Sequence, residues 1–221
     1  MMKTAMIWGA AGAIGKALTA QLLAYQWQVV AIVRDEKQME NQSTLTQSAL
    51  TIEADFTNTR SVQNAILSAR SEVDQVSLWI YAGGDEIFST IEIPSPEGRQ
   101  QGLGDMLTGA FVTSDATLPM LKEDTPLIFI ESVSRQPGLS DGSEYHWAQS
   151  AFEAFIETLQ FEERKRRVML VQPGLLDTPN GETDSFPIVA EPAAPEIIAN
   201  HIMSAYHEGH KGVLDPSIFN I

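Results

Sequence analysis

The sequence contains no cysteine, which excludes disulfide bonds, thiolate catalysis and zinc sites built on cysteine. Basic residues are few, 14 against 29 acidic residues, so the formal net charge is -15 at pH 7. A chain with this charge repels nucleic acids and anionic lipid surfaces, and we expect neither nucleic acid nor membrane as a partner. Long apolar runs are also missing, because none reaches the roughly 20 residues that a membrane-spanning helix needs.

The length of 221 residues suits one α/β domain and is too short for a dinucleotide domain plus a separate substrate domain. We therefore expect a single domain over residues 1–221. The first expected strand begins almost at Met1, which leaves no space for a signal peptide. Together with the lack of cysteine, this predicts a cytoplasmic protein.

The segment that is most informative about function lies at the start of the chain. An apolar run stops at Gly9, glycines recur at Gly12 and Gly15, and helix-forming residues continue as far as Tyr25. This pattern predicts a strand, a tight turn and a helix. Gly9 would permit the turn, Gly12 would let the backbone approach a pyrophosphate, and Gly15 would let the helix pack close to the sheet. The N–H groups at the helix N-terminus would face the phosphates.

Such a spacing predicts a dinucleotide site only weakly by itself, and a glycine-rich turn without a ligand is the alternative. The next segment favours the dinucleotide site. Residues 28–33 are apolar and β-branched, as in a buried parallel strand, and Arg34 and Asp35 follow them. At this strand end an acid binds the 2′-hydroxyl of NAD, whereas a cation suits the 2′-phosphate of NADP. Arg34 therefore favours NADP, while Asp35 and a plain surface role for Arg34 leave NAD open.

The rest of the chain alternates expected strands and helices, which requires a parallel, doubly wound sheet. The predicted fold is thus a single-domain α/β fold of the Rossmann type. Residues 175–194 contain prolines and little periodicity, so we expect them to form a mobile flap over the ligand. The remaining strands are expected at 50–54, 75–81, 127–131, 167–172 and 212–214, and the remaining helices at 60–69, 99–121, 145–165 and 195–207.

Residues at other expected strand ends also fit a cofactor. Asp55, with Phe56 beside it, follows the third strand, where a side chain could meet the adenine. The fourth strand ends in Ala82, Gly83 and Gly84, whose small size would let the backbone lie against a cofactor ribose.

Taken together, these segments resemble the short-chain dehydrogenase/reductase family over nearly the whole chain. Tyr145 follows Ser132 by thirteen residues, the spacing of the catalytic pair in that family. The resemblance implies a Rossmann-type fold, an NAD(P) cofactor and oxidoreductase activity on a small-molecule substrate. The other matching pieces are the glycine motif 9–15, Asp55, Ala82-Gly83-Gly84 where the family usually has Asn-Asn-Ala-Gly, and Pro173-Gly174 followed by Thr178.

The chain departs from the family pattern in three places. Its glycine spacing is Gly-x-x-Gly-x-x-Gly, which resembles the extended and atypical branches, whereas standard members have Gly-x-x-x-Gly-x-Gly. Gln149 stands four residues after Tyr145, where standard members have lysine. Met106, three residues before Gly109, aligns with the asparagine of the family. Two of the four catalytic positions therefore differ.

These departures predict a direction of reaction. In the family, the tyrosine hydroxyl protonates the carbonyl oxygen as hydride arrives from the nicotinamide, and the serine hydroxyl binds the same oxygen. The lysine binds the nicotinamide ribose and lowers the tyrosine pKa. Gln149 can bind a ribose hydroxyl but carries no charge. Tyr145 would keep its proton, so we expect reduction of a carbonyl rather than oxidation of an alcohol.

The resemblance implies catalytic roles for Ser132, Tyr145 and Gln149, and no metal is expected. The favoured function is an NADP-dependent oxidoreductase. A non-catalytic NAD(P)-binding regulator or scaffold is the first alternative, and a lyase or isomerase is the second. The helices at 99–121 and 145–165 could pair across a two-fold axis, which predicts a homodimer or homotetramer. The cofactor contacts that the resemblance implies are Gly9, Ala11, Gly12, Ala13, Ile14, Gly15, Arg34, Asp55, Phe56, Ala82, Gly83, Gly84, Gln149, Pro173, Gly174 and Thr178.

Overall fold

The structure is a computed structural model that describes residues 2–37, 48–83, 104–131, 143–174, 176 and 193–215. Its parallel strands form one seven-stranded sheet in the order β3-β2-β1-β4-β5-β6-β7. This confirms the predicted α/β fold. The strands are β1 (Thr4–Trp8), β2 (Gln28–Val33), β3 (Leu50–Glu53), β4 (Leu78–Tyr81), β5 (Leu127–Ile130), β6 (Val168–Val171) and β7 (Gly212–Leu214).

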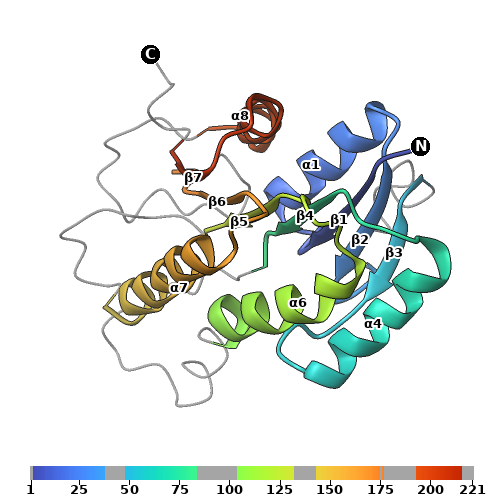
Figure 1. The fold of residues 1–221 in the computed structure, drawn as a ribbon, viewed down its shortest axis with the longest axis horizontal. Helices are drawn as coiled ribbons and strands as arrows, with labels where there is room; N and C mark the ends of the chain where they lie inside the picture. Colours follow the sequence, from blue (N-terminus) through green and yellow to red (C-terminus); the bar gives the residue numbers. More distant parts are fainter. Residues whose placement is uncertain are drawn as a thin grey trace.

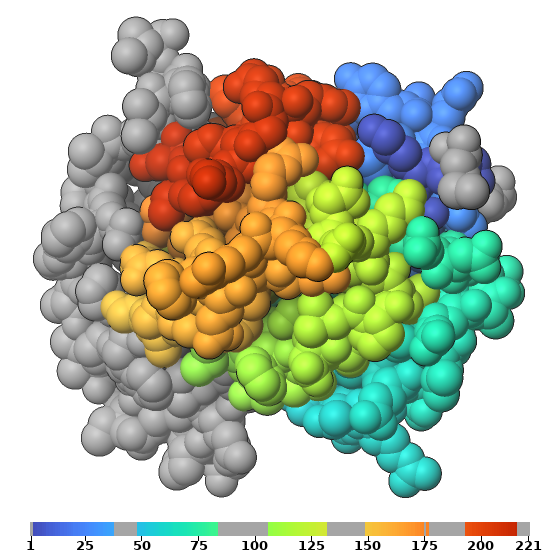
Figure 2. Space-filling view, viewed as in Figure 1, coloured from blue at the N-terminus to red at the C-terminus, as the bar shows by residue number. Residues whose placement is uncertain are grey.

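Helices cover both faces of the sheet (Figure 1). α1 (Ala13–Ala24) and α8 (Pro195–Glu208) lie on one face, and α4 (Thr59–Glu72), α6 (Gly109–Thr117) and α7 (Ser143–Glu162) lie on the other. A separate apolar core fills the space on each side. In the space-filling view, α7 in orange and α6 in green lie side by side, with α8 in red beyond α7 (Figure 2). Within the described residues, no helix is both long and apolar enough to cross a membrane.

The strand order reverses direction along the sheet between β1 and β4, which pair with Trp8 opposite Tyr81. All strands are parallel, so their carboxyl ends share one edge of the sheet. In open α/β sheets ligands bind outside the carboxyl ends of the strands at such a reversal. The fold therefore directs attention to the segments that follow β1, β2 and β4.

Two expected elements differ clearly from the structure, and most of the others differ by one to three residues at their ends. The strand expected over residues 75–81 begins at Leu78, because the backbone of Val76 bonds to the segment before β5 instead. The Val76 N–H donates to the Met120 carbonyl at 2.9 Å, and its carbonyl accepts from the Thr125 hydroxyl at 2.8 Å. The helix expected over 99–121 is divided, within the described residues, into a π-helical turn η1 (Gly104–Thr108), α6 and a 3-10 turn η2 (Leu118–Met120).

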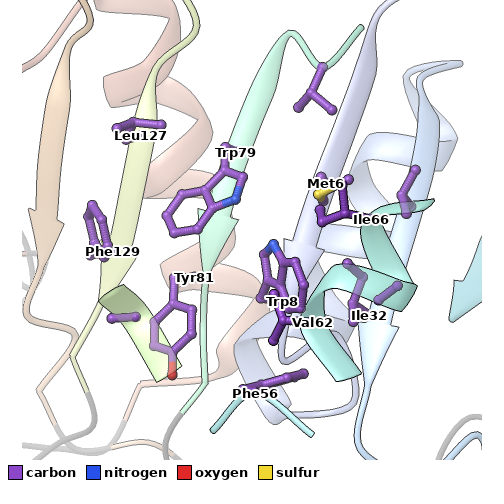
Figure 3. Packing of buried hydrophobic residues seen from close by; sticks show 14 of the residues in the cluster. Met6, Trp8, Ile32, Phe56, Val62, Ile66, Trp79, Tyr81, Leu127 and Phe129 are labelled. Atoms are coloured by element: carbon purple, nitrogen blue, oxygen red, sulfur yellow. The ribbon is translucent and has the colours of Figure 1, made fainter. Parts of the chain in front are cut away.

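Aromatic side chains fill the core beneath α4, α6 and α7 (Figure 3). Phe56 packs edge-on against Trp8, with ring centroids 5.5 Å apart, and against Tyr81 at 6.3 Å. Trp79 stacks on Tyr81 at 6.2 Å and meets Phe129 edge-on at 5.1 Å. Each such pair adds about 0.5–1.5 kcal/mol beyond area burial. This packing fixes the carboxyl ends of β1 and β4 relative to the segment before α4.

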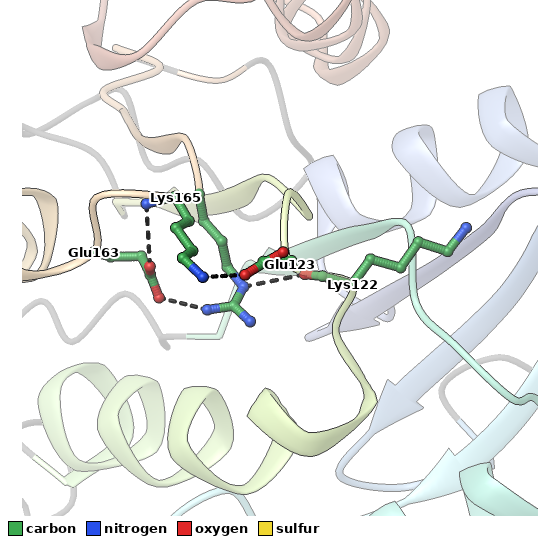
Figure 4. A network of polar contacts seen from close by, with 5 residues as sticks. Lys122, Glu123, Glu163 and Lys165 are labelled. Carbon is green, nitrogen blue, oxygen red and sulfur yellow. Dashed lines mark hydrogen bonds and ion pairs between the residues drawn. The ribbon is translucent and has the colours of Figure 1, made fainter.

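A polar network lies at the opposite edge of the sheet, where β5 and β6 begin (Figure 4). Arg166 pairs with Glu163 at 2.5 Å and donates from Nε to the Lys122 carbonyl at 3.3 Å. Lys165 pairs with Glu123, and this partner lowers the pKa of the Glu123 carboxyl. The network joins the turn after α7 to the segment before β5, away from the carboxyl edge.

Candidate functional site

The carboxyl edge of the sheet brings together most of the described residues that the sequence predicted for a cofactor. They come from segments far apart in the chain, and the parallel sheet places them at one edge. These residues are Gly9 after β1, Arg34 after β2, Asp55 after β3, Ala82 and Gly83 after β4, and Pro173 and Gly174 after β6.

Gly9 makes the turn that ends β1. Its φ of +86° lies in the left-handed region, and a Cβ atom there would lie 2.4 Å from the Ala82 carbonyl oxygen. The Gly9 N–H donates to the Ile32 carbonyl at 2.9 Å. The turn thus rests on the ends of β2 and β4, and only glycine fits it.

Gly15 and Gly12 are glycines for different reasons. A Cβ atom on Gly15 would lie 2.2 Å from the Gly9 carbonyl oxygen and 2.9 Å from the Ala10 Cα, so the packing of α1 requires glycine. Gly12 has an ordinary φ of -67° and is exposed. The nearest atom to a Cβ on Gly12 is the Gly9 carbonyl oxygen at 3.4 Å, which is ordinary contact. Within the described residues, nothing in the fold requires a glycine at position 12.

In the described part of the chain, no side chain caps the N-terminus of α1. Gly12 is its N-cap residue and provides no side-chain acceptor for the first-turn N–H groups, which include those of Ala13 and Ile14. α4 is capped differently, because Asn58 Oδ1 accepts from the N–H groups of Arg60 at 3.0 Å and Ser61 at 3.1 Å. An uncapped helix N-terminus can bind an anion through its N–H groups and its dipole.

Arg34 is held at the end of β2 by an aromatic ring. Its guanidinium carbon lies 5.9 Å from the centroid of the Phe56 ring, and Phe56 is only 2% exposed. Arg34 itself is half-buried. The neighbouring Asp35 is exposed, and its Oδ1 accepts a hydrogen bond from the Lys37 N–H at 2.9 Å. The contact with Phe56 therefore gives the Arg34 guanidinium a defined position near the glycine turn.

Asp55 is exposed and fixed to the start of α4. Its Oδ1 accepts from the Thr57 N–H at 3.0 Å and from the Thr57 hydroxyl at 2.7 Å, while its own N–H donates to Ser61 Oγ at 3.0 Å. These bonds hold the carboxylate at the carboxyl edge. Its contact with an adenine stays a prediction.

Tyr81, which sequence reasoning missed, shapes the end of β4. It is fully buried, and its hydroxyl fills the space that two glycines leave. A Cβ on Gly83 would lie 2.8 Å from this hydroxyl oxygen, and a Cβ on Gly109 would lie 2.4 Å from it. An aromatic residue directly before Ala-Gly-Gly was the available signal. Gly84 lies outside the described residues.

The predicted catalytic positions are described only in part. Gln149 lies on α7 and is 4% exposed, so a polar group is buried at the position that the sequence analysis aligned with the family lysine. Tyr145 lies one helical turn earlier, and its side chain is outside the described part of the chain. Ser132 and Thr178 also lie outside it. Met106, which the sequence analysis aligned with the family asparagine, is 4% exposed and belongs to the aromatic core cluster.

The structure adds a polar bridge that the sequence did not indicate. The side-chain amide of Gln172, after β6, donates to Glu131 Oε2 at 2.8 Å and to Glu153 Oε1 at 2.9 Å. Glu131 ends the apolar run of β5 and is 4% exposed, and Glu153 lies on α7. An acid at the end of a fully buried strand was the only available signal. Among the residues that the structure describes, no cluster of His, Asp and Glu could hold a metal.

Comparisons with known proteins agree with this arrangement. The family model described as short chain dehydrogenase matches residues 3–185, so the chain belongs to the short-chain dehydrogenase family. Members of this family bind NAD(P). This confirms the resemblance seen in the sequence.

Individual relatives are distant. An uncharacterized oxidoreductase of Staphylococcus epidermidis is 23% identical over 189 residues, which cover 83% of this chain and 82% of the relative. A short-chain dehydrogenase/reductase from Serratia marcescens superposes with a TM-score of 0.85 at 19% identity, covering 97% of each chain. An alcohol dehydrogenase from the archaeon Thermococcus sibiricus, complexed with 5-hydroxy-NADP, gives 0.83 at 23% identity, covering 97% of this chain and 96% of that one. The two structures share the fold.

Proposed function

We propose that this protein is an NADP-dependent short-chain oxidoreductase that reduces a small carbonyl compound. The observation that carries the proposal is Gly12, which neither φ nor the packing of the described residues requires. A glycine that the fold does not need, at an uncapped helix N-terminus, leaves space for a pyrophosphate.

Arg34 supports the phosphorylated form of the cofactor. Its guanidinium is supported by Phe56 at the end of β2, where the ribose of a dinucleotide lies in this kind of fold. An arginine can make charge-assisted, bidentate hydrogen bonds with a phosphate, which the bare hydroxyl of NAD does not offer. The complex of the Thermococcus sibiricus relative with 5-hydroxy-NADP agrees with this preference.

Bound NADPH would supply the hydride. The residues of this chain would handle the proton, with the Tyr145 hydroxyl donating it to the carbonyl oxygen and the Ser132 hydroxyl holding the same oxygen. Gln149 would bind a ribose hydroxyl without adding a positive charge. An unperturbed tyrosine has a pKa of about 10, so Tyr145 would be protonated near neutral pH and ready for reduction.

We also infer that the protein forms a homodimer or homotetramer through α6 and α7. Phe111 of α6 is 58% exposed and contacts Phe155 of α7, with ring centroids 6.0 Å apart. A second copy of the same surface would cover this apolar pair.

The substrate would bind beneath a flap formed by residues 175–194. Most of that segment lies outside the described residues, and an isolated bridge joins Leu176 to Ala193 at its two ends.

Two measurements on the purified protein test the proposed function. Titration with NADPH, followed by nicotinamide fluorescence, should show saturable binding that is tighter than that of NADH. A panel of small aldehydes, ketones and quinones should then include compounds that consume NADPH. Saturable binding without turnover of any compound would favour a non-catalytic NADP-binding protein. Absence of binding to either nucleotide would refute both functions.

A further inference from the structure

A glutamine side chain joins three elements at the carboxyl edge. Gln172 follows β6, and its Nε2 donates to Glu131 Oε2 at 2.8 Å and to Glu153 Oε1 at 2.9 Å. Glu131 follows β5 and Glu153 lies on α7. One neutral amide group thus bridges two carboxylates that are 22 positions apart in sequence, from Glu131 to Glu153.

The bridge is important for the local structure because its acidic groups are removed from water. Glu131 is 4% exposed, and Glu153 and Gln172 are half-buried. A carboxylate removed from water needs hydrogen-bond donors, and two carboxylates repel each other more strongly where solvent screening is weak. Replacing the Gln172 amide by an apolar group would leave Glu131 and Glu153 without the donor that they share. We expect α7, the end of β5 or both to shift in response.

The bridge is adjacent in sequence to one half of the proposed cofactor site. Glu131 directly precedes Ser132, Gln172 directly precedes Pro173, and Glu153 lies one helical turn after Gln149. The resemblance implies that Ser132 binds the reacting carbonyl oxygen, that Gln149 binds the nicotinamide ribose and that Pro173 contacts the cofactor. The residues proposed for the adenosine end, Gly12 and Arg34, follow β1 and β2 on the other side of β4.

We propose that Gln172 is a positioning residue that aligns the carboxyl ends of β5 and β6 with the middle of α7 for the nicotinamide half of NADPH. This inference rests on the proposed function. Gln172 acts through its neighbours and through Glu131 and Glu153, so its loss should weaken contacts with the nicotinamide half and spare those with the adenosine half.

The chain offers a matched control at the far end of the same helix and strand. Gln160 of α7 donates from Nε2 to the Val168 carbonyl, where β6 begins, at 3.5 Å. Gln160→Met therefore removes a glutamine contact between α7 and β6 as Gln172→Met does, but at the edge away from the site. If the loss of any contact between α7 and β6 were enough to weaken NADPH binding, both variants would bind NADPH more weakly.

Two ligands allow the two halves of the cofactor site to be tested separately. NADPH contacts both, whereas adenosine 2′,5′-bisphosphate lacks the nicotinamide and reports on the adenosine half alone. Gln172→Met should bind NADPH about tenfold more weakly, because the nicotinamide half of the site would have to be realigned on binding, and should bind the bisphosphate within about twofold of wild type. Gln160→Met should bind both ligands as wild type does.

A conservative pair at Glu131 completes the test. Glu131→Gln keeps an oxygen that can accept from Gln172 and should bind NADPH within about threefold of wild type, whereas Glu131→Met should match Gln172→Met. Equal losses for both ligands, equal effects in the Gln172 and Gln160 variants, or Glu131→Gln as weak as Glu131→Met would overturn the positioning role. Wild-type protein that binds the bisphosphate and NADPH keeps the proposed cofactor site intact in each of these cases. Wild-type protein that binds neither overturns the proposed function and this inference with it.

Discussion

A Cβ atom on Gly15 would lie 2.2 Å from the carbonyl oxygen of Gly9, so α1 packs against the end of β1 only because residue 15 is glycine, while Gly9 is required by its own φ of +86°. Among the residues that the structure describes, Gly12, between them, has no such neighbour, and the nearest contact of a Cβ there would be an ordinary 3.4 Å. The three glycines of one motif therefore separate into two that the fold requires and one that it does not.

This separation predicts opposite results for two matched substitutions. Gly15→Val should destabilise the protein by about 3 kcal/mol or more, because backbone atoms must move. Gly12→Val should keep the free energy of unfolding within about 1 kcal/mol of wild type, yet abolish NADPH binding, because its methyl groups would occupy the place of the pyrophosphate. Denaturant unfolding and NADPH titration measure the two effects. Normal NADPH binding by Gly12→Val would place the nucleotide elsewhere.

Arg34 should set the preference for NADPH over NADH. Removing a charge-assisted hydrogen bond costs about 1.5–3 kcal/mol, so Arg34→Ala should lower NADPH affinity by at least about tenfold and leave NADH affinity nearly unchanged. Lys37→Ala is the control, because Lys37 is an exposed cation three residues further along. Fluorescence titrations with both nucleotides provide the comparison. If Arg34→Ala kept its preference, or if Lys37→Ala lost it as well, the assignment of NADP would be wrong.

Gln149 should restrict the enzyme to reduction. Gln149→Lys would introduce a positive charge one helical turn from Tyr145, and each unit by which it lowers the tyrosine pKa is worth about 1.4 kcal/mol. This variant should gain alcohol oxidation at neutral pH. Because position 149 is 4% exposed, an ammonium that does not fit there would weaken NADPH binding instead. A variant that binds NADPH normally and shows an unchanged pH profile for oxidation would count against this role of Gln149.

The ion pair at the opposite edge predicts a pH dependence that is unrelated to catalysis. Lys165 lowers the pKa of Glu123, so the pair stabilises the fold above the unfolded pKa of this carboxyl and the effect is lost as pH falls through the folded pKa. Lys165→Met should raise the Glu123 pKa, as followed by NMR of the carboxyl carbon. Lys211→Met, at another exposed lysine, should leave it unchanged. An equal effect of the two variants on Glu123 would contradict the pairing.

Sequence periodicity and glycine spacing were sufficient for the fold and for the carboxyl edge, because both depend on local pattern and on the strand ends of a parallel sheet. β2 and β7 have the expected bounds. The π-helical turn at Gly104–Thr108 could not be predicted, because α-helical and π-helical turns share nearly the same apolar pattern.

Contacts between segments that are distant in the sequence could not be predicted either. The cation–π contact between Arg34 and Phe56 and the hydrogen bonds of Gln172 with Glu131 and Glu153 join residues that lie far apart in the sequence. Their side chains meet only after the sheet has set the register of its strands, so no local pattern marks them. The motifs indicated the site. These contacts add a defined position for the Arg34 guanidinium and a proposed role for Gln172.

The most direct test of the central claim is the rate of NADPH oxidation with a carbonyl substrate in Tyr145→Phe, compared with wild type. The substitution removes only the hydroxyl that we propose as the proton donor. Tyr145→Phe should bind NADPH with nearly the wild-type affinity and lose the reaction by at least about a hundredfold, as is typical for a general acid. Wild-type turnover by Tyr145→Phe would contradict the proposed mechanism and require a different chemistry for this site.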